Sequence, residues 1–137
     1  LGVQAEMLDV RNQDDLDRAF ETATRHHVDA LVIGADGITQ MHQQAIVHRT
    51  ALTRLPASYP SREFVEAGGL MAYAVNYPYL YRRFASYIDK ILKGARPADL
   101  PVEQPLKFEL VINTTTAKSL GLVIPKTLLL RADEVIQ

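Results

Sequence analysis

Short apolar segments alternate with helix-forming segments along most of the chain, and this order limits the folds that it can adopt. Residues 30–33 are apolar throughout and are followed by Gly34, a pattern typical of a strand buried on both faces of a parallel sheet. Strands that alternate with helices pair in parallel through right-handed crossovers. The order therefore predicts an α/β fold with a three-layer, Rossmann-like parallel sheet. The other predicted strands are residues 5–10, 57–59, 70–74 and 107–112.

Capping residues and helix breakers set the boundaries of the predicted helices. Asn12, Ser61 and Asn76 are side chains that accept hydrogen bonds from the first turn of a helix. Pro56 and Gly94 are typical of positions just beyond a helix end. Helices are predicted for residues 13–27, 39–55, 62–67, 77–93 and 114–120, with an extended connector at 95–106 and a tail that starts at Pro125.

Composition excludes several classes of protein. The chain has 137 residues, the size of one domain, and 47% of them are hydrophobic, as in an ordinary globular protein. The net charge of −1 argues against a nucleic-acid partner, because such proteins normally carry a basic surplus. No apolar run approaches the roughly 18 residues that a membrane span needs. Since there is no cysteine, disulfides, thiolate metal sites and thiol nucleophiles are excluded.

Metal-ligand and catalytic patterns are not found. His26 and His27 are adjacent and His42 and His48 are six residues apart, so neither pair has the spacing that places two ligands on one helix face. Neither a nucleophile elbow nor a glycine-rich phosphate loop occurs. We therefore expect no metal, no cofactor and no catalytic residues.

Asp36 is the most distinctive candidate for ligand binding. It lies in the turn of residues 34–37, directly after a predicted buried strand, and this is where open α/β sheets bind ligands. Its carboxylate could pair with a cationic group, although capping of the following helix explains the same residue equally well. Tyr59 and Tyr73, at predicted strand ends, are candidates for stacking on a ligand ring.

An ordered set of segments from residue 55 onward resembles the C-terminal half of ABC-transporter solute-binding proteins with the type I periplasmic-binding fold. Residues 1–54 match more loosely, through the order of elements and the surroundings of Ala19 and Asp29. The resemblance therefore covers nearly the whole chain. The segments that carry it are 55–57 (Leu-Pro-Ala), 61–64 (Ser-Arg-Glu-Phe), 66–73 (Glu-Ala-Gly-Gly-Leu-Met-Ala-Tyr), 87–94 (Tyr-Ile-Asp-Lys-Ile-Leu-Lys-Gly), 97–105, 107–113 (Lys-Phe-Glu-Leu-Val-Ile-Asn), 116–118, 120–122, 124–125 and 128–136.

The resemblance implies a domain organisation. Family members have two α/β lobes, joined by crossing strands, with a ligand cleft between them. Residues 1–137 would form the C-terminal lobe together with returning crossover segments at about 68–106, and most of the N-terminal lobe would be absent. Because the chain begins with Leu1, we expect a mature form or a fragment. The apolar stripe of helix 77–93 would then lack its usual partner, and we expect it to pack elsewhere, for example in a homo-oligomer.

The resemblance also implies a function. A solute-binding protein captures a small organic solute and delivers it to an ABC permease in the membrane, without chemistry on the solute. The chain would be periplasmic or a cell-surface lipoprotein, with an export signal outside this sequence. An amine would suit Asp36 and a ring would suit the tyrosines, so the expected solute is amino-acid-like or aromatic. The positions that match the ligand-binding loops are Asp36, Gly37, Tyr59, Ser61, Arg62, Tyr73 and Asn76.

Two alternatives compete with this interpretation. The ligand-sensing domain of a regulator shares the fold, but the sequence lacks DNA-binding helices, and residues 97–105 and 124–134 favour the transporter family. A small α/β enzyme would need a nucleophile, a base and an orienting group that converge, and no such set is visible.

Overall fold

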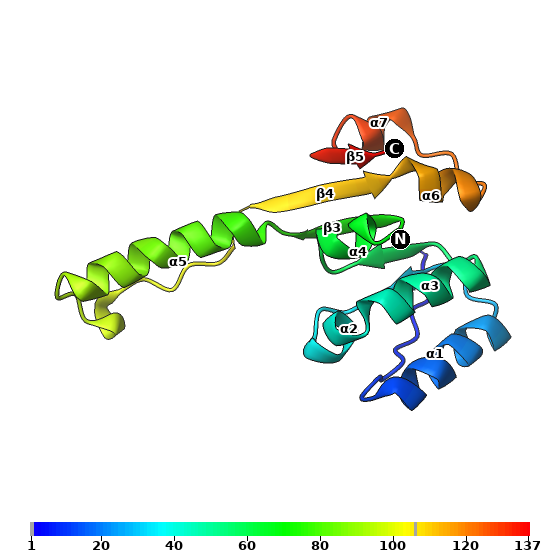
Figure 1. Cartoon of the computed structure of the whole chain (residues 1–137), viewed down its shortest axis with the longest axis horizontal. Helices are drawn as coiled ribbons and strands as arrows, with labels where there is room; N and C mark the ends of the chain where they lie inside the picture. The colour runs from blue at the N-terminus through cyan, green and yellow to red at the C-terminus, as the bar shows by residue number, and fades with distance from the viewer. Residues whose placement is uncertain (1, 106) are drawn as a thin grey trace.

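A five-stranded sheet organises the chain in the computed structural model, which describes residues 2–105 and 107–137 (Figure 1). The strand order is β1-β2-β3-β4-β5. The pairs β1–β2, β2–β3 and β4–β5 are parallel, whereas β3–β4 is antiparallel. The strands are β1 (Leu31–Val32), β2 (Ala57–Tyr59), β3 (Met71–Val75), β4 (Phe108–Asn113) and β5 (Glu134–Ile136).

Helices connect the strands in the predicted alternating order, which confirms the α/β class. Asn12 and Asn76 cap α1 and α5 through side-chain hydrogen bonds, as predicted. The predicted helix at 39–55 is two helices, because the chain turns at His42. The helices are α1 (Gln13–Arg25), α2 (Gly37–Met41), α3 (Gln43–Thr53), α4 (Arg62–Glu66), α5 (Tyr77–Leu92), α6 (Thr114–Ser119) and α7 (Lys126–Leu129), with a 3₁₀ turn, η1, at Pro97–Asp99.

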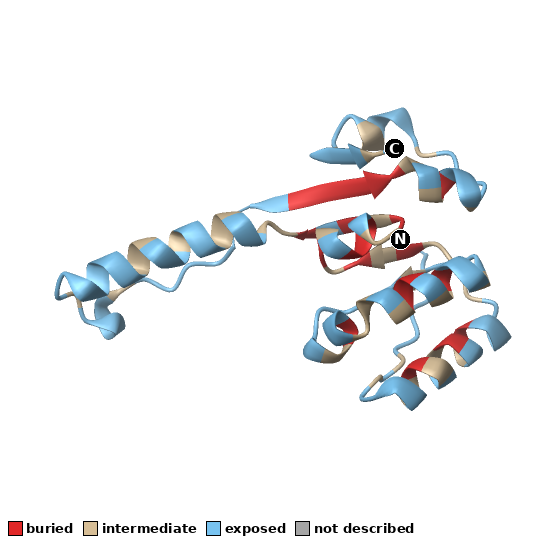
Figure 2. Cartoon of the chain, in the orientation of Figure 1, coloured by how far each residue is buried: buried red, intermediate tan, exposed pale blue. Residues whose placement is uncertain are grey.

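The core lies between one face of the sheet and the helices α1, α3 and α4 (Figure 2). Along β3, Ala72 and Ala74 are buried toward this core, whereas Tyr73 between them is exposed. This alternation follows from the period of two in a strand. The buried side chains from the helices are large and apolar: Leu16 and Phe20 from α1, Ile46 and Val47 from α3, and Phe64 and Val65 from α4.

Three further details of the predicted strands and tail were wrong. Residues 5–10 are described but pair with no strand, and a segment without a pairing partner gains nothing from its β propensity. Strand β4 runs antiparallel to β3, because the chain travels out along α5 and returns before β4 begins. The tail after Pro125 contains α7 and the three-residue strand β5, whose pairing with β4 is non-local.

Helix α5 extends away from the sheet, and none of its residues, all of which are described, is buried (Figures 1 and 2). The connector runs back beside it: Tyr87 donates to the carbonyl of Pro101 at 2.7 Å, and Arg83 pairs with Glu103. The last connector residue, Leu106, lies outside the described residues, as does Leu1. Within the described ranges, no helix combines the length and hydrophobicity required to cross a membrane.

Candidate ligand-binding site

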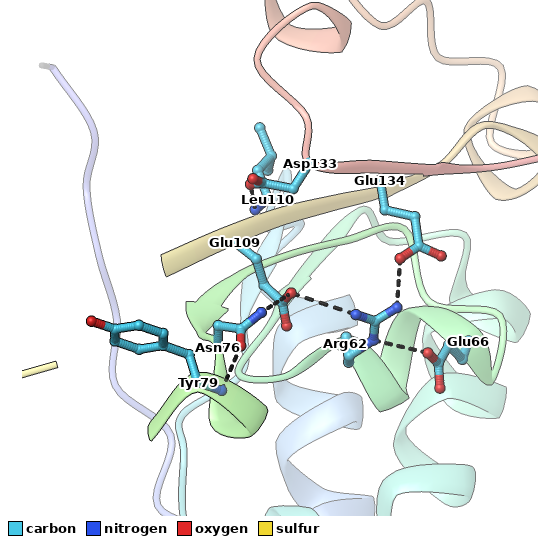
Figure 3. A network of polar contacts seen from close by, with 8 residues as sticks. All are labelled: Arg62, Glu66, Asn76, Tyr79, Glu109, Leu110, Asp133 and Glu134. Carbon is cyan, nitrogen blue, oxygen red and sulfur yellow. Dashed lines mark hydrogen bonds and ion pairs between the residues drawn. The ribbon is translucent and has the colours of Figure 1, made fainter. Parts of the chain in front are cut away.

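The carboxyl ends of β2 and β3 meet the beginning of β4 at one edge of the sheet. Because β2 and β3 are parallel, the start of α4 after β2 and the start of α5 after β3 lie at this edge. Because β4 is antiparallel to β3, Glu109 lies opposite Ala74, near the carboxyl end of β3. The topology thus brings Arg62, Asn76 and Glu109 together from three separate parts of the sequence (Figure 3).

Arg62, the first residue of α4, is surrounded by three carboxylates. Its Nε donates to Glu66 at 3.0 Å, one terminal nitrogen lies 3.5 Å from Glu109, and the other donates to Glu134 (Figure 3). The hydrogen bonds to Glu66 and Glu134 raise the pKa of the guanidinium above its usual value. Arg62 is therefore a permanent cation in an acidic surrounding.

Asn76 is held at both ends of its side-chain amide. Its carbonyl oxygen accepts from the backbone N–H of Tyr79 at 2.9 Å and so caps α5. Its amide nitrogen donates to the carboxylate of Glu109 at 2.8 Å. These two contacts define which end of the amide is the oxygen and which is the nitrogen.

Glu109 is the buried centre of the network. Only 6% of the residue is exposed, although it carries a carboxylate. A buried carboxylate is costly unless it is paired and hydrogen-bonded, and one oxygen of Glu109 meets both Asn76 and Arg62. On the neighbouring strands, Asp133 accepts from the backbone N–H of Leu110 at 2.9 Å and so fastens the start of β5 to β4.

Asp36 and Gly37 lie at the carboxyl end of β1, on the same edge of the sheet. Asp36 caps α2: its side chain accepts from the backbone N–H of Thr39 at 2.7 Å, and the hydroxyl of Thr39 accepts from the backbone N–H of Asp36. The capping role that the sequence allowed is thus present. Asp36 is also exposed, so its negative charge remains available to a cation at this edge.

The other three predicted site residues lie elsewhere or differ in their contacts. Tyr59 is 3% exposed, stacks on Phe64 and hydrogen-bonds to Thr50 at 2.7 Å; burial raises the pKa of its hydroxyl. We therefore leave it out of the candidate site. Tyr73 is 65% exposed on the sheet face opposite the core, where it stacks on Phe108. Ser61 is the N-cap residue of α4, but its buried hydroxyl has no hydrogen-bond partner among the described residues, so the predicted side-chain cap was wrong.

Sequence analysis missed Glu109, Glu66 and Glu134. A usable signal for Glu109 was present, because it is the one charged residue between Phe108 and Ile112 in an apolar strand, and glutamate is rarely buried unless it is paired. Glu66 and Glu134 gave no comparable signal, since exposed glutamates are common. Their contact with Arg62 depends on how the chain folds.

The mostly parallel sheet and the polar edge at its strand ends are typical of a domain that binds a small solute. A family model described as ABC transporter substrate binding protein matches residues 1–136. The chain therefore belongs to the ABC transporter substrate-binding protein family. A comparison with curated proteins gives no match.

Solved structures share the fold of this chain. The ABC domain in complex with L-Trp from Streptococcus pneumoniae has 28% identity and a TM-score of 0.88, over 98% of this chain and 46% of that chain. A conserved domain protein from Vibrio cholerae has 24% identity and a TM-score of 0.81, over 89% of this chain and 41% of that chain. A ligand-free, open substrate binding protein with adhesive properties from Clostridium difficile has 19% identity and a TM-score of 0.64, over 93% of this chain and 42% of that chain. The chain thus spans less than half the length of these proteins.

Proposed function

We propose that this chain forms the C-terminal lobe and crossover segments of a solute-binding protein that serves an ABC importer. Outside the cytoplasm, the protein captures a small organic solute, amino-acid-like or aromatic. It then delivers this solute to a permease in the membrane. The observation that carries the proposal is the grouping of Arg62 and Asn76 at the carboxyl edge of the sheet in a member of this family. Solute capture by closure of two lobes needs no catalytic group, and we assign none.

The chemistry of the edge supports an amino-acid-like solute. The exposed carboxylate of Asp36 suits an ammonium group, whereas the N–H donors of Arg62 and Asn76 suit a carboxylate. The L-Trp complex of the Streptococcus pneumoniae relative also supports this class. We therefore place Asp36, Gly37, Arg62 and Asn76 in the proposed site. Ser61 is left out because its hydroxyl is buried, and Tyr73 because it lies on the sheet face opposite the core.

Replacing Asp36 with Asn is expected to weaken binding of L-tryptophan by about threefold or more, because a charge-assisted contact with the ammonium group is lost. Asn still accepts the capping hydrogen bond from Thr39, so the unfolding transition is expected to stay unchanged. Isothermal titration calorimetry measures the affinity, and thermal unfolding measures the stability.

The matched control is Asp14→Asn, which removes an exposed carboxylate from the first turn of α1. This control is expected to bind like the wild type. Equal affinity of the wild type and Asp36→Asn would remove Asp36 from the site. Binding of solutes that lack an amino group, without binding of L-tryptophan or other amino acids, would overturn the proposed solute class.

A further inference from the structure

We propose that Glu109 is a positioning residue, whose buried carboxylate orients Arg62 and Asn76 so that their remaining donors serve the solute. The inference rests on the proposed function, because it assigns a role at that same site. Glu109 is itself almost inaccessible, so it acts through the two side chains that it contacts and not by touching the solute.

Counting the donors shows what the network leaves available. A guanidinium has five N–H bonds and a side-chain amide has two. Arg62 contacts one carboxylate through each of its three nitrogens, and Asn76 gives one N–H to Glu109. Within residues 2–105 and 107–137, two N–H bonds of Arg62 and one of Asn76 therefore have no acceptor. These donors fit the oxygens of a solute carboxylate.

Glu109 differs from the other two carboxylates around Arg62 in two respects. Its side chain is 7% exposed, whereas those of Glu66 and Glu134 are about half exposed. It is also the one of the three that contacts Asn76. Since Glu109 lies within β4, in register with Ala74 of β3, its position is defined by the sheet. An exposed ion pair constrains its partners much less, because water competes and both side chains rotate.

The geometry also links the two elements that frame the edge. Through Glu109, the start of α4 is connected to the residue that caps α5. A shift of either element would change the distance between Glu109 and one of its two partners. The donors of Arg62 and Asn76 are therefore expected to hold a fixed relation before the solute arrives, which lowers the cost of ordering them on binding.

The test compares Glu109→Gln with Glu66→Gln in the whole 137-residue chain. In Glu109→Gln, the new amide can still accept from Asn76 but carries no charge for Arg62. We expect the affinity of this variant for L-tryptophan, the probe, to fall about three- to tenfold. Glu66→Gln removes an exposed partner of the same arginine and is expected to change the affinity by less than about twofold. Equal losses in the two variants, or unchanged affinity in Glu109→Gln, would overturn the proposal.

A second readout needs no solute and separates this inference from the proposed function. The side-chain amide of Asn76 is observed by ¹⁵N NMR. It donates to Glu109, whereas Glu66 contacts Arg62 and not Asn76. We therefore expect Glu109→Gln to shift the amide resonances of Asn76 and Glu66→Gln to leave them unchanged. If the wild type does not bind L-tryptophan, the NMR comparison alone tests whether Glu109 positions its partners. Unchanged spectra in Glu109→Gln would refute that role.

A second variant covers the case in which Glu109→Gln does not fold. Glu109→Asp keeps the negative charge in the buried position, but its carboxylate is shorter by one methylene and is drawn back from Arg62 and Asn76. It is expected to weaken the affinity at least threefold, roughly the value of one lost hydrogen bond, while circular dichroism shows the same helix content. Wild-type affinity together with unchanged Asn76 amide resonances in Glu109→Asp would count against the proposal.

Discussion

Replacing Phe64 with Ala is expected to lower the free energy of unfolding by about 3–5 kcal/mol, the range for a large aromatic side chain removed from a core. Phe64 has no exposed surface and stacks on Tyr59 with ring centroids 5.2 Å apart. It anchors α4, which carries Arg62 two residues earlier. Because small domains are stable by only about 5–15 kcal/mol, this loss removes a large fraction of the total. Urea denaturation followed by circular dichroism measures it.

Val32→Ala is the matched control for Phe64→Ala. Val32 lies in β1 but is 86% exposed, so its truncation is expected to change the stability by no more than about 0.5 kcal/mol. A loss below about 1 kcal/mol in Phe64→Ala, or equal losses in the two variants, would show that Phe64 is not in the core that we describe.

Replacing Gly69 with Ala is expected to destabilise the fold by about 1–3 kcal/mol, the usual cost of overpacking. A Cβ atom at this position would lie 2.6 Å from a ring carbon of Tyr59 and 2.7 Å from the carbonyl oxygen of Phe64. That carbonyl also accepts from the backbone N–H of Gly69 at 2.8 Å, so it cannot withdraw without losing the hydrogen bond. Thermal and urea unfolding measure the change.

Gly34→Ala provides the comparison for Gly69→Ala. A Cβ at Gly34 would meet no atom within 4 Å, and its backbone is not in the left-handed region. We expect this variant to be as stable as the wild type or slightly more stable, because alanine restricts the unfolded chain. A Gly69→Ala variant with wild-type stability would contradict the close packing of Gly69 against Tyr59.

The elements set by local chemistry were predictable from the sequence. Asn12 and Asn76 marked two helix starts because an N-cap depends on the residues within one turn. The apolar run at 30–33 indicated a strand because it, too, is a pattern of neighbouring residues. In the structure, the strand is limited to Leu31–Val32. The position of Arg62 and Asn76 at one edge also followed from the topology of parallel strands.

The features that depend on distant partners could not be predicted. Residues 5–10 have the composition of a strand, but a strand needs a neighbour to pair with. The antiparallel return of β4 depends on where the chain goes after α5. Tyr59 ends a strand, as expected, but its ring lies in the core because Thr50 and Phe64 meet it there. The partners of Arg62 were hidden for the same reason, since Glu134 is 72 residues away.

The central claim is that an amino-acid solute binds at the carboxyl edge of β1, β2 and β3. Titration of the ¹⁵N-labelled chain with L-tryptophan, followed by backbone and side-chain NMR shifts, tests it most directly. We predict saturable shifts at Asp36, Gly37, Arg62 and Asn76, and none in the small cavity at the opposite end of the sheet, which Thr50, Arg54 and Ser119 line. Shifts that saturate around that cavity, or no shifts at the carboxyl edge, would contradict the account.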